Sequence, residues 1–160
     1  MRCGRSSRFQ PFAIVVVAVI AVAGFASLRN LRERLEKAQV EANVRNLNSA
    51  LQLEIAHRIA AGQENGIADL AGTNPVRMAE SPLPGYLGEF AVAPPDVAPG
   101  IWYFDRADGE LVYHPALSCH LTGAGSPPLL KWRIQRSQRP GRPIFAGGLQ
   151  LVAAVDYRWY

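Results

Sequence analysis

The sequence has little of what catalytic and metal-binding sites are built from. It holds only two cysteines, Cys3 and Cys119, and three histidines. It contains no C-x-x-C, H-E-x-x-H or G-x-S-x-G motif and no phosphate-binding glycine loop that opens a helix. We therefore expect two inert thiols, no enzyme activity, no catalytic residue, no cofactor and no metal site.

Charged residues are also few, at 19% of the chain, whereas hydrophobic residues make up 49%. This balance excludes a chain that is disordered throughout. The formal net charge is +4, and basic residues gather on both sides of one apolar run: Arg2, Arg5, Arg8, Arg29, Arg32, Arg34 and Lys37. Flanking cations of this kind are typical of membrane segments, so the charge does not predict a nucleic-acid partner.

The apolar run extends from Phe12 to Leu28 and contains one polar side chain, that of Ser27. A bilayer core of about 30 Å needs roughly 20 apolar residues in a helix. We expect residues 12–28 to be a transmembrane helix that follows a basic leader at residues 1–11. A signal peptide cleaved after Ala23 and a buried core helix are the alternatives.

Residues 29–61 contain neither proline nor glycine, and their apolar positions follow a helical period. One face is predicted to contact other proteins and holds Leu28, Leu31, Leu35, Ala38 and Ala42. A neighbouring face is predicted to pack on a sheet and holds Val44, Leu47, Leu51, Ile55 and Ile59. Gly62 is expected to end the helix. A helix that continues unbroken from residue 12 favours a retained stalk over a cleaved signal peptide.

After Gly62 the composition changes to turn formers, and residues 62–100 are predicted to be an irregular loop. Short helices are expected around Ala68–Leu70 or Val76–Glu80. Residues 101–160 are predicted to form an antiparallel sheet of four strands, at Ile101–Phe104, Glu110–Tyr113, Leu129–Gln135 and Leu149–Trp159. The fold class is thus α+β, with the long N-terminal helix packed on a small sheet.

Three features of the predicted sheet domain allow a second interpretation. Asp105 and Asp108 could bind a metal, but aspartate at a hairpin turn more often accepts hydrogen bonds from its own backbone. His114 is expected at a strand end, facing solvent. The aromatic residues could stack on a ligand, but we expect them to form the core: Trp102, Tyr103, Phe104, Trp132, Tyr157 and Trp159.

Taken together, the basic leader, the long helix, the proline-rich loop and the sheet resemble the superfamily of type IV pilins and type II secretion pseudopilins. The segments that carry the resemblance in the sheet domain are Asn74-Pro75, Tyr86-Leu87-Gly88-Glu89, Pro99–Asp105 and Glu110–Tyr113. Gly4 is the only glycine placed for leader processing, although arginine and serine follow it, and no glutamate lies in the first apolar turns.

The resemblance implies a pilin-like fold and a non-catalytic subunit of a type IV pilus or type II secretion filament. The implied partners are other pilin-like subunits, inner-membrane assembly components and the lipid bilayer. The implied location is the bacterial inner membrane, crossed once, with a periplasmic sheet domain. An uncleaved, membrane-anchored binding or scaffold protein and a secreted soluble domain are the alternatives.

Overall fold

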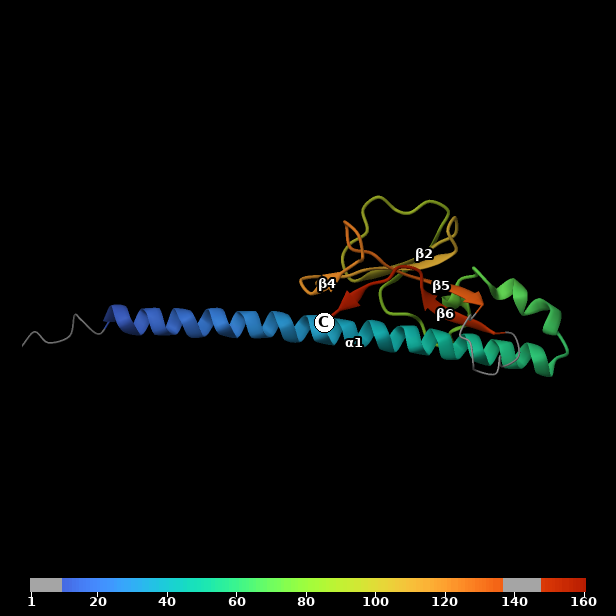
Figure 1. Ribbon diagram of the computed structural model, residues 1–160, viewed down its shortest axis with the longest axis horizontal. Coiled ribbons are helices and arrows are strands. Elements are labelled where there is room, and N and C mark those ends of the chain that lie inside the picture. The colour runs from blue at the N-terminus through green and yellow to red at the C-terminus, as the bar shows by residue number, and fades with distance from the viewer. Residues whose placement is uncertain (1–9, 137–147) are drawn as a thin grey trace, which may run out of the picture. The chain divides into compact units, whose positions relative to one another are not determined.

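The computed structural model describes residues 10–136 and 148–160 (Figure 1). The chain divides into two units, Met1–Leu35 and Glu36–Tyr160, and each is described by itself. The helical elements are α1 (Gln10–Ala60), η1 (Glu64–Gly66), η2 (Ala68–Leu70) and η3 (Pro75–Met78). The strands are β1 (Tyr86–Phe90), β2 (Ile101–Asp105), β3 (Glu110–His114), β4 (Leu121–Thr122), β5 (Leu130–Arg136), β6 (Leu149–Ala153) and β7 (Arg158–Trp159).

The helix α1 begins and ends where its sequence dictates. Pro11 lies in the first turn, where a backbone N–H has no partner within the helix in any case. At the other end, Gly62 has a positive φ of 71° and its N–H donates to the Ile59 carbonyl, while the N–H of Gln63 donates to the Arg58 carbonyl. This pair of bonds is the Schellman motif. The prediction that Gly62 ends the helix is confirmed.

The prediction of a membrane-spanning segment is wrong. Among the described residues, no helix combines the length and the hydropathy that a membrane crossing requires. The apolar run from Phe12 to Leu28 is shorter than the roughly 20 residues that a bilayer core demands, and Arg29 follows it directly. The prediction of a transmembrane helix at residues 12–28 is therefore wrong, and so is the prediction of a single-pass inner-membrane location.

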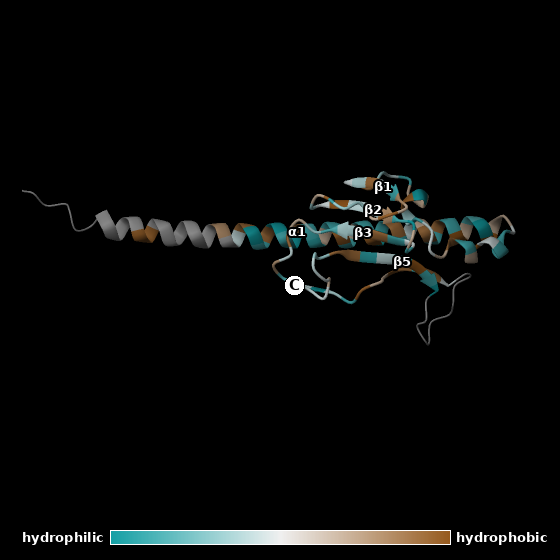
Figure 2. Cartoon of the chain, turned by 90° about the horizontal axis from the view of Figure 1, so that it is seen from above, coloured by the Kyte–Doolittle hydropathy of each residue, from teal (hydrophilic) through white to brown (hydrophobic). Residues whose placement is uncertain are grey.

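The main sheet has five strands in the order β1-β2-β3-β5-β6, and Figure 2 shows β1, β2, β3 and β5 side by side in that order. The hairpin of β2 and β3 was predicted from its two β-rich runs, and it pairs from Ile101↔His114 to Asp105↔Glu110. The expectation of a purely antiparallel sheet is wrong, because β1 runs parallel to β2. Residues 91–100 supply the return connection that a parallel pair needs.

Two further strand predictions need correction. β1 lies within residues 62–100, which were predicted to be an irregular loop; its short run holds Gly88 and Glu89, which weaken a strand signal. The predicted strand Leu149–Trp159 is divided in two, since β6 belongs to the main sheet whereas β7 pairs with β4 in a separate two-stranded sheet. The short helices η2 and η3 lie where they were expected.

One face of α1 and one face of the main sheet form the core of the second unit. Leu47, Leu51 and Ile55 are buried in the core, and Val44 and Ile59 are partly buried against it. The sheet contributes Trp102, whose ring centroid lies 4.5 Å from that of Tyr113 and 5.3 Å from that of Trp132. Val40, one turn before Val44 on the same helix face, is also buried in this core.

Polar side chains of α1 also bind the backbone of β6. The amide nitrogen of Gln52 donates to the Leu149 carbonyl at 2.9 Å, and the backbone N–H of Leu151 donates to the Asn48 Oδ1 at 3.1 Å. Asn48 and Gln52 are four residues apart and therefore lie on one side of the helix. These two directional bonds fix the position of β6 along α1. Burial of leucines alone is not directional and would allow β6 to shift along the helix.

Candidate assembly surface

The face of α1 that was predicted to contact other proteins is largely exposed. Leu28, Leu31 and Leu35 have exposed fractions of 55%, 54% and 61%. Ala38 is also exposed, whereas Ala42 is partly buried. These leucines have more than half of their surface in water and form an apolar surface at helical spacing. Covering this surface with a partner would lower the free energy, because apolar area would leave water. Gly4, the predicted processing site, lies outside the described residues.

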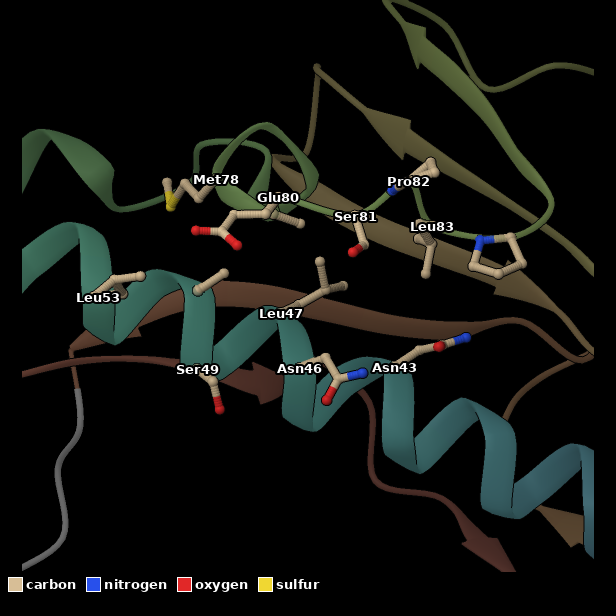
Figure 3. Close-up of a pocket in the computed structure, with 13 residues that line it drawn as sticks. Asn43, Asn46, Leu47, Ser49, Leu53, Met78, Glu80, Ser81, Pro82 and Leu83 are labelled. Carbon is tan, nitrogen blue, oxygen red and sulfur yellow. The ribbon is translucent and has the colours of Figure 1, made fainter.

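A groove lies within the second unit, between α1 and the segment Met78–Pro84, and has a volume of about 510 Å³ (Figure 3). Its floor is apolar and includes the buried side chains of Leu47 and Leu83. Leu53 also lines it and is 48% exposed. The polar lining residues are Asn43, Asn46, Ser49, Glu80 and Ser81. Among the described residues that line the groove, Glu80 is therefore the one with an ionisable side chain.

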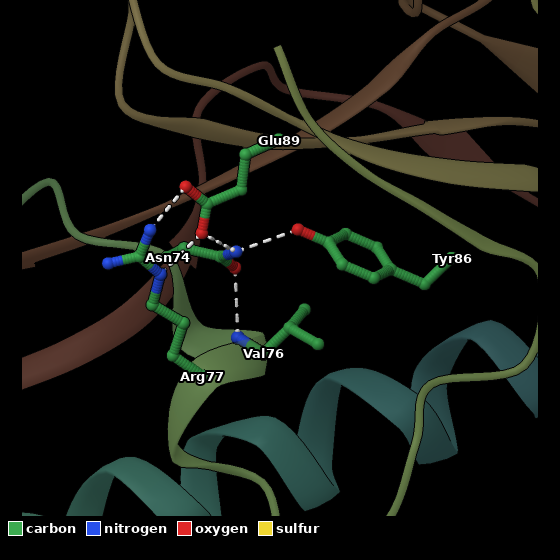
Figure 4. Close-up of polar contacts among 5 residues, drawn as sticks. All are labelled: Asn74, Val76, Arg77, Tyr86 and Glu89. Atoms are coloured by element: carbon green, nitrogen blue, oxygen red, sulfur yellow. Dashed lines mark hydrogen bonds and ion pairs between the residues drawn. The ribbon is translucent and has the colours of Figure 1, made fainter.

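A network of side chains fixes the wall of the groove at both of its ends (Figure 4). Asn74 and Arg77 precede the wall, and Tyr86 and Glu89 follow it. The Arg77 guanidinium makes two bonds to the Glu89 carboxylate, at 2.5 and 2.6 Å. Asn74, which is buried, donates to Tyr86 Oη and to Glu89 Oε1, both at 2.7 Å, and accepts from the Val76 N–H. The segment between them is thereby closed into a loop.

The electrostatics of this network follow from its hydrogen bonds. The Arg77 guanidinium and then the Asn74 amide donate to the charged form of Glu89, and these bonds hold the pKa of Glu89 below its ordinary value. Burial raises the pKa of the Tyr86 hydroxyl. Protonation of Glu89 would therefore weaken the bonds that its carboxylate accepts from Arg77 and Asn74.

We expect the substitution Glu89→Gln to destabilise the protein at neutral pH by about 1 kcal/mol, since much of the ion pair with Arg77 is open to solvent. The folded-state pKa of Glu89 lies below the unfolded value, so its contribution is present above the unfolded value and is lost as the pH falls through the folded one. Urea unfolding of both proteins between pH 3 and pH 7 should show the difference shrinking in acid. The exposed Glu64→Gln is the control; a difference that grows in acid would contradict the assignment.

A second network attaches α1 to the connection between β3 and β4. The Glu36 carboxylate accepts hydrogen bonds from Tyr113 Oη at 2.8 Å, from the Ala116 N–H at 2.6 Å and from the Leu117 N–H at 3.0 Å. Burial, and then the bond to Glu36, raises the pKa of Tyr113. Glu36 was not predicted from the sequence, because one glutamate on a charged helix gives no signal of a partner some 80 positions away.

The surroundings of Asp105, of His114 and of the aromatic residues distinguish between the two interpretations that the sequence allowed. Asp105 Oδ1 accepts from the backbone N–H groups of Ala107 and Asp108, so the prediction of a turn role for Asp105 is confirmed. His114 was expected to face solvent, which is wrong: it is partly buried and its Nδ1 lies 2.7 Å from the Val97 carbonyl. The aromatic residues expected in the core are found there with one exception: Trp102, Phe104, Trp132 and Trp159 are buried in it, and Tyr157 is partly buried against it. Tyr103 is also buried, but outside this cluster, with its ring against that of Phe90.

Comparison of the chain with protein-family models, with curated proteins and with solved structures gave no match in any of the three. The features of the chain that bear on its function are therefore the exposed helix face, the groove and the two networks.

Proposed function

We propose that this chain is a pilin-like or pseudopilin-like subunit, without catalytic activity, that assembles with other subunits of a type IV pilus or type II secretion filament through α1. The observation that carries the proposal is the exposure of Leu28, Leu31 and Leu35 at helical spacing on α1. A helix whose apolar residues were all meant for its own core would not leave three leucines in water.

The second unit supports the same function. The sheet and α1 share a core, and the Glu36 and Asn74 networks fix the connecting segments to it. Such a unit presents a fixed surface to its neighbours, as a subunit of a repeating assembly requires.

Cross-linking through single cysteines tests the proposal. In full-length protein that carries Cys3→Ser and Cys119→Ser, Leu31→Cys or Leu35→Cys should give disulfide-linked products with other subunits under mild oxidation. Leu87→Cys is the matched control, since Leu87 is a leucine of similar exposure (55%) on β1. We expect products at least tenfold more abundant at positions 31 and 35 than at position 87. Equal yields at all three positions would remove the helix face from the proposal.

A further inference from the structure

We infer that the groove between α1 and Met78–Pro84 is the acceptor for residues Leu28–Leu35 of a second copy of this chain, with Arg32 of that copy next to Glu80. This inference rests on the proposed function, because it names the surface that receives the exposed helix face. Four properties of the groove and of the helix segment carry it: shape, apolar matching, charge and asymmetry.

The dimensions of the two surfaces agree. α1 borders the groove from Asn43 to Leu53, which is roughly 15 Å at 1.5 Å per residue. The segment Leu28–Leu35 is roughly 10 Å long by the same rise. It can lie beside α1 along the groove without reaching either end. A volume of about 510 Å³ is sufficient for the apolar side chains of one helix face, though not for a whole domain.

The apolar residues match as well. Helices that bind in grooves do so through anchors at positions i, i+3, i+4 and i+7. Leu28, Leu31 and Leu35 occupy i, i+3 and i+7, and each is more than half exposed. On the acceptor, Leu53 and Met78 line the groove above the buried Leu47 and Leu83. Each surface leaves apolar area in water that the other could cover.

Charge favours a second copy over an acidic or neutral peptide. Glu80 is exposed, and Figure 3 shows its carboxylate between α1 and the groove wall. Among the contacts of the described residues it has no ion-pair partner. Arg32, one residue after Leu31, is exposed and likewise has none in the described part of the chain. The charge that Glu80 brings to the described lining of the groove is therefore opposite in sign to the charge of Arg32 beside the apolar anchors.

The two surfaces are different parts of the chain, and each copy carries both of them. A contact between unlike surfaces is heterologous, so every copy that accepts a helix still offers its own. Such contacts continue from copy to copy and produce a ring or a filament. The groove thus gives the proposed subunit a contact that can continue beyond two copies, as a filament requires.

Charge reversal in full-length protein tests the inference. Glu80→Arg and Arg32→Glu should each weaken self-association by about three- to tenfold, measured as the concentration dependence of sedimentation velocity at low salt. The double variant E80R/R32E should recover most of the loss, because the pair is restored with its signs exchanged. Glu64→Arg and Arg136→Glu are the matched controls, since both residues are exposed and lie outside the groove; they should leave association within twofold of the unchanged protein.

The outcomes separate this inference from the proposed function. Single reversals without effect, or a double variant that recovers nothing, would overturn the groove as acceptor even where cross-linking through position 31 succeeds. Cross-linking to a different subunit by a chain that stays monomeric alone would overturn the second copy as occupant and leave the proposed function standing. A monomer that also gives no cross-linked product would overturn both.

Discussion

Leu51→Ala should reduce the free energy of unfolding by about 2–5 kcal/mol. Leu51 lies in the C-terminal part of α1, its exposed fraction is 0%, and it belongs to the core that α1 shares with the sheet. Truncation removes buried methyl groups and leaves a cavity between α1 and the sheet, which these packed elements can close only in part. Because small domains are stable by about 5–15 kcal/mol, this single change consumes a large share of the total.

Leu53→Ala is the matched control for this experiment. Leu53 is two positions along the same helix, but 48% of its surface is exposed. We expect its truncation to cost less than about 1 kcal/mol. Urea unfolding followed by circular dichroism measures both, and the slope with denaturant should stay unchanged if the native fold is kept. Equal losses for the two variants would show that α1 does not bury the face assigned to the core.

Glu36→Gln should reduce the free energy of unfolding by about 2–3 kcal/mol, the second-largest effect that we expect. The carboxylate accepts from Tyr113 and from the backbone N–H groups of Ala116 and Leu117. Bonds to a charged acceptor contribute about 1.5–3 kcal/mol, and an amide in its place can accept through only one of its two heavy atoms. Its NH₂ group would face N–H donors, so at least one of the three bonds is lost.

A double-mutant cycle separates the side-chain bond from the two backbone bonds. Tyr113→Phe removes one donor and should cost about 1 kcal/mol. The combined variant with Glu36→Gln should cost less than the sum, since the two side chains share one bond. Strict additivity would mean that Tyr113 and Glu36 do not interact in solution. Glu41→Gln, at an exposed position five residues further along α1, is the control and should change stability by no more than about 0.5 kcal/mol.

The same pair predicts a loss of stability in alkali. Burial and the bond to Glu36 raise the pKa of Tyr113 above its ordinary value of 10.0. Above that value the unfolded chain loses the phenolic proton while the folded chain keeps it, so the free energy of unfolding falls as the pH rises. Unfolding measured between pH 8 and pH 11 should show this decline in the unchanged protein and a smaller one in Tyr113→Phe. Parallel curves would contradict the raised pKa.

Local pattern was sufficient to predict the elements whose residues interact with near neighbours in the chain. The helical spacing of Leu47, Leu51 and Ile55 indicated the buried face of α1, because residues three and four apart share one side of a helix. Gly62 marked its end, since a left-handed C-cap is most easily adopted by glycine. The β2–β3 hairpin followed from two β-rich runs and a short turn, and η3 lies where a helix was expected beside Pro75.

The features that depend on contacts between residues far apart in the sequence were decided only by the tertiary structure. β1 became a strand because β2 offers it a hydrogen-bonding edge, which no local signal at Tyr86–Phe90 reveals. Asn74 and Glu89, and likewise Glu36 and Tyr113, meet only after the chain has folded. The apolar content of residues 12–28 suggested a membrane crossing that the hydropathy and length of the described helix do not support. Periodicity determined which faces of α1 are apolar. Packing against the sheet decided that the face with Leu47, Leu51 and Ile55 is buried, because a helix can present only one side to its own core.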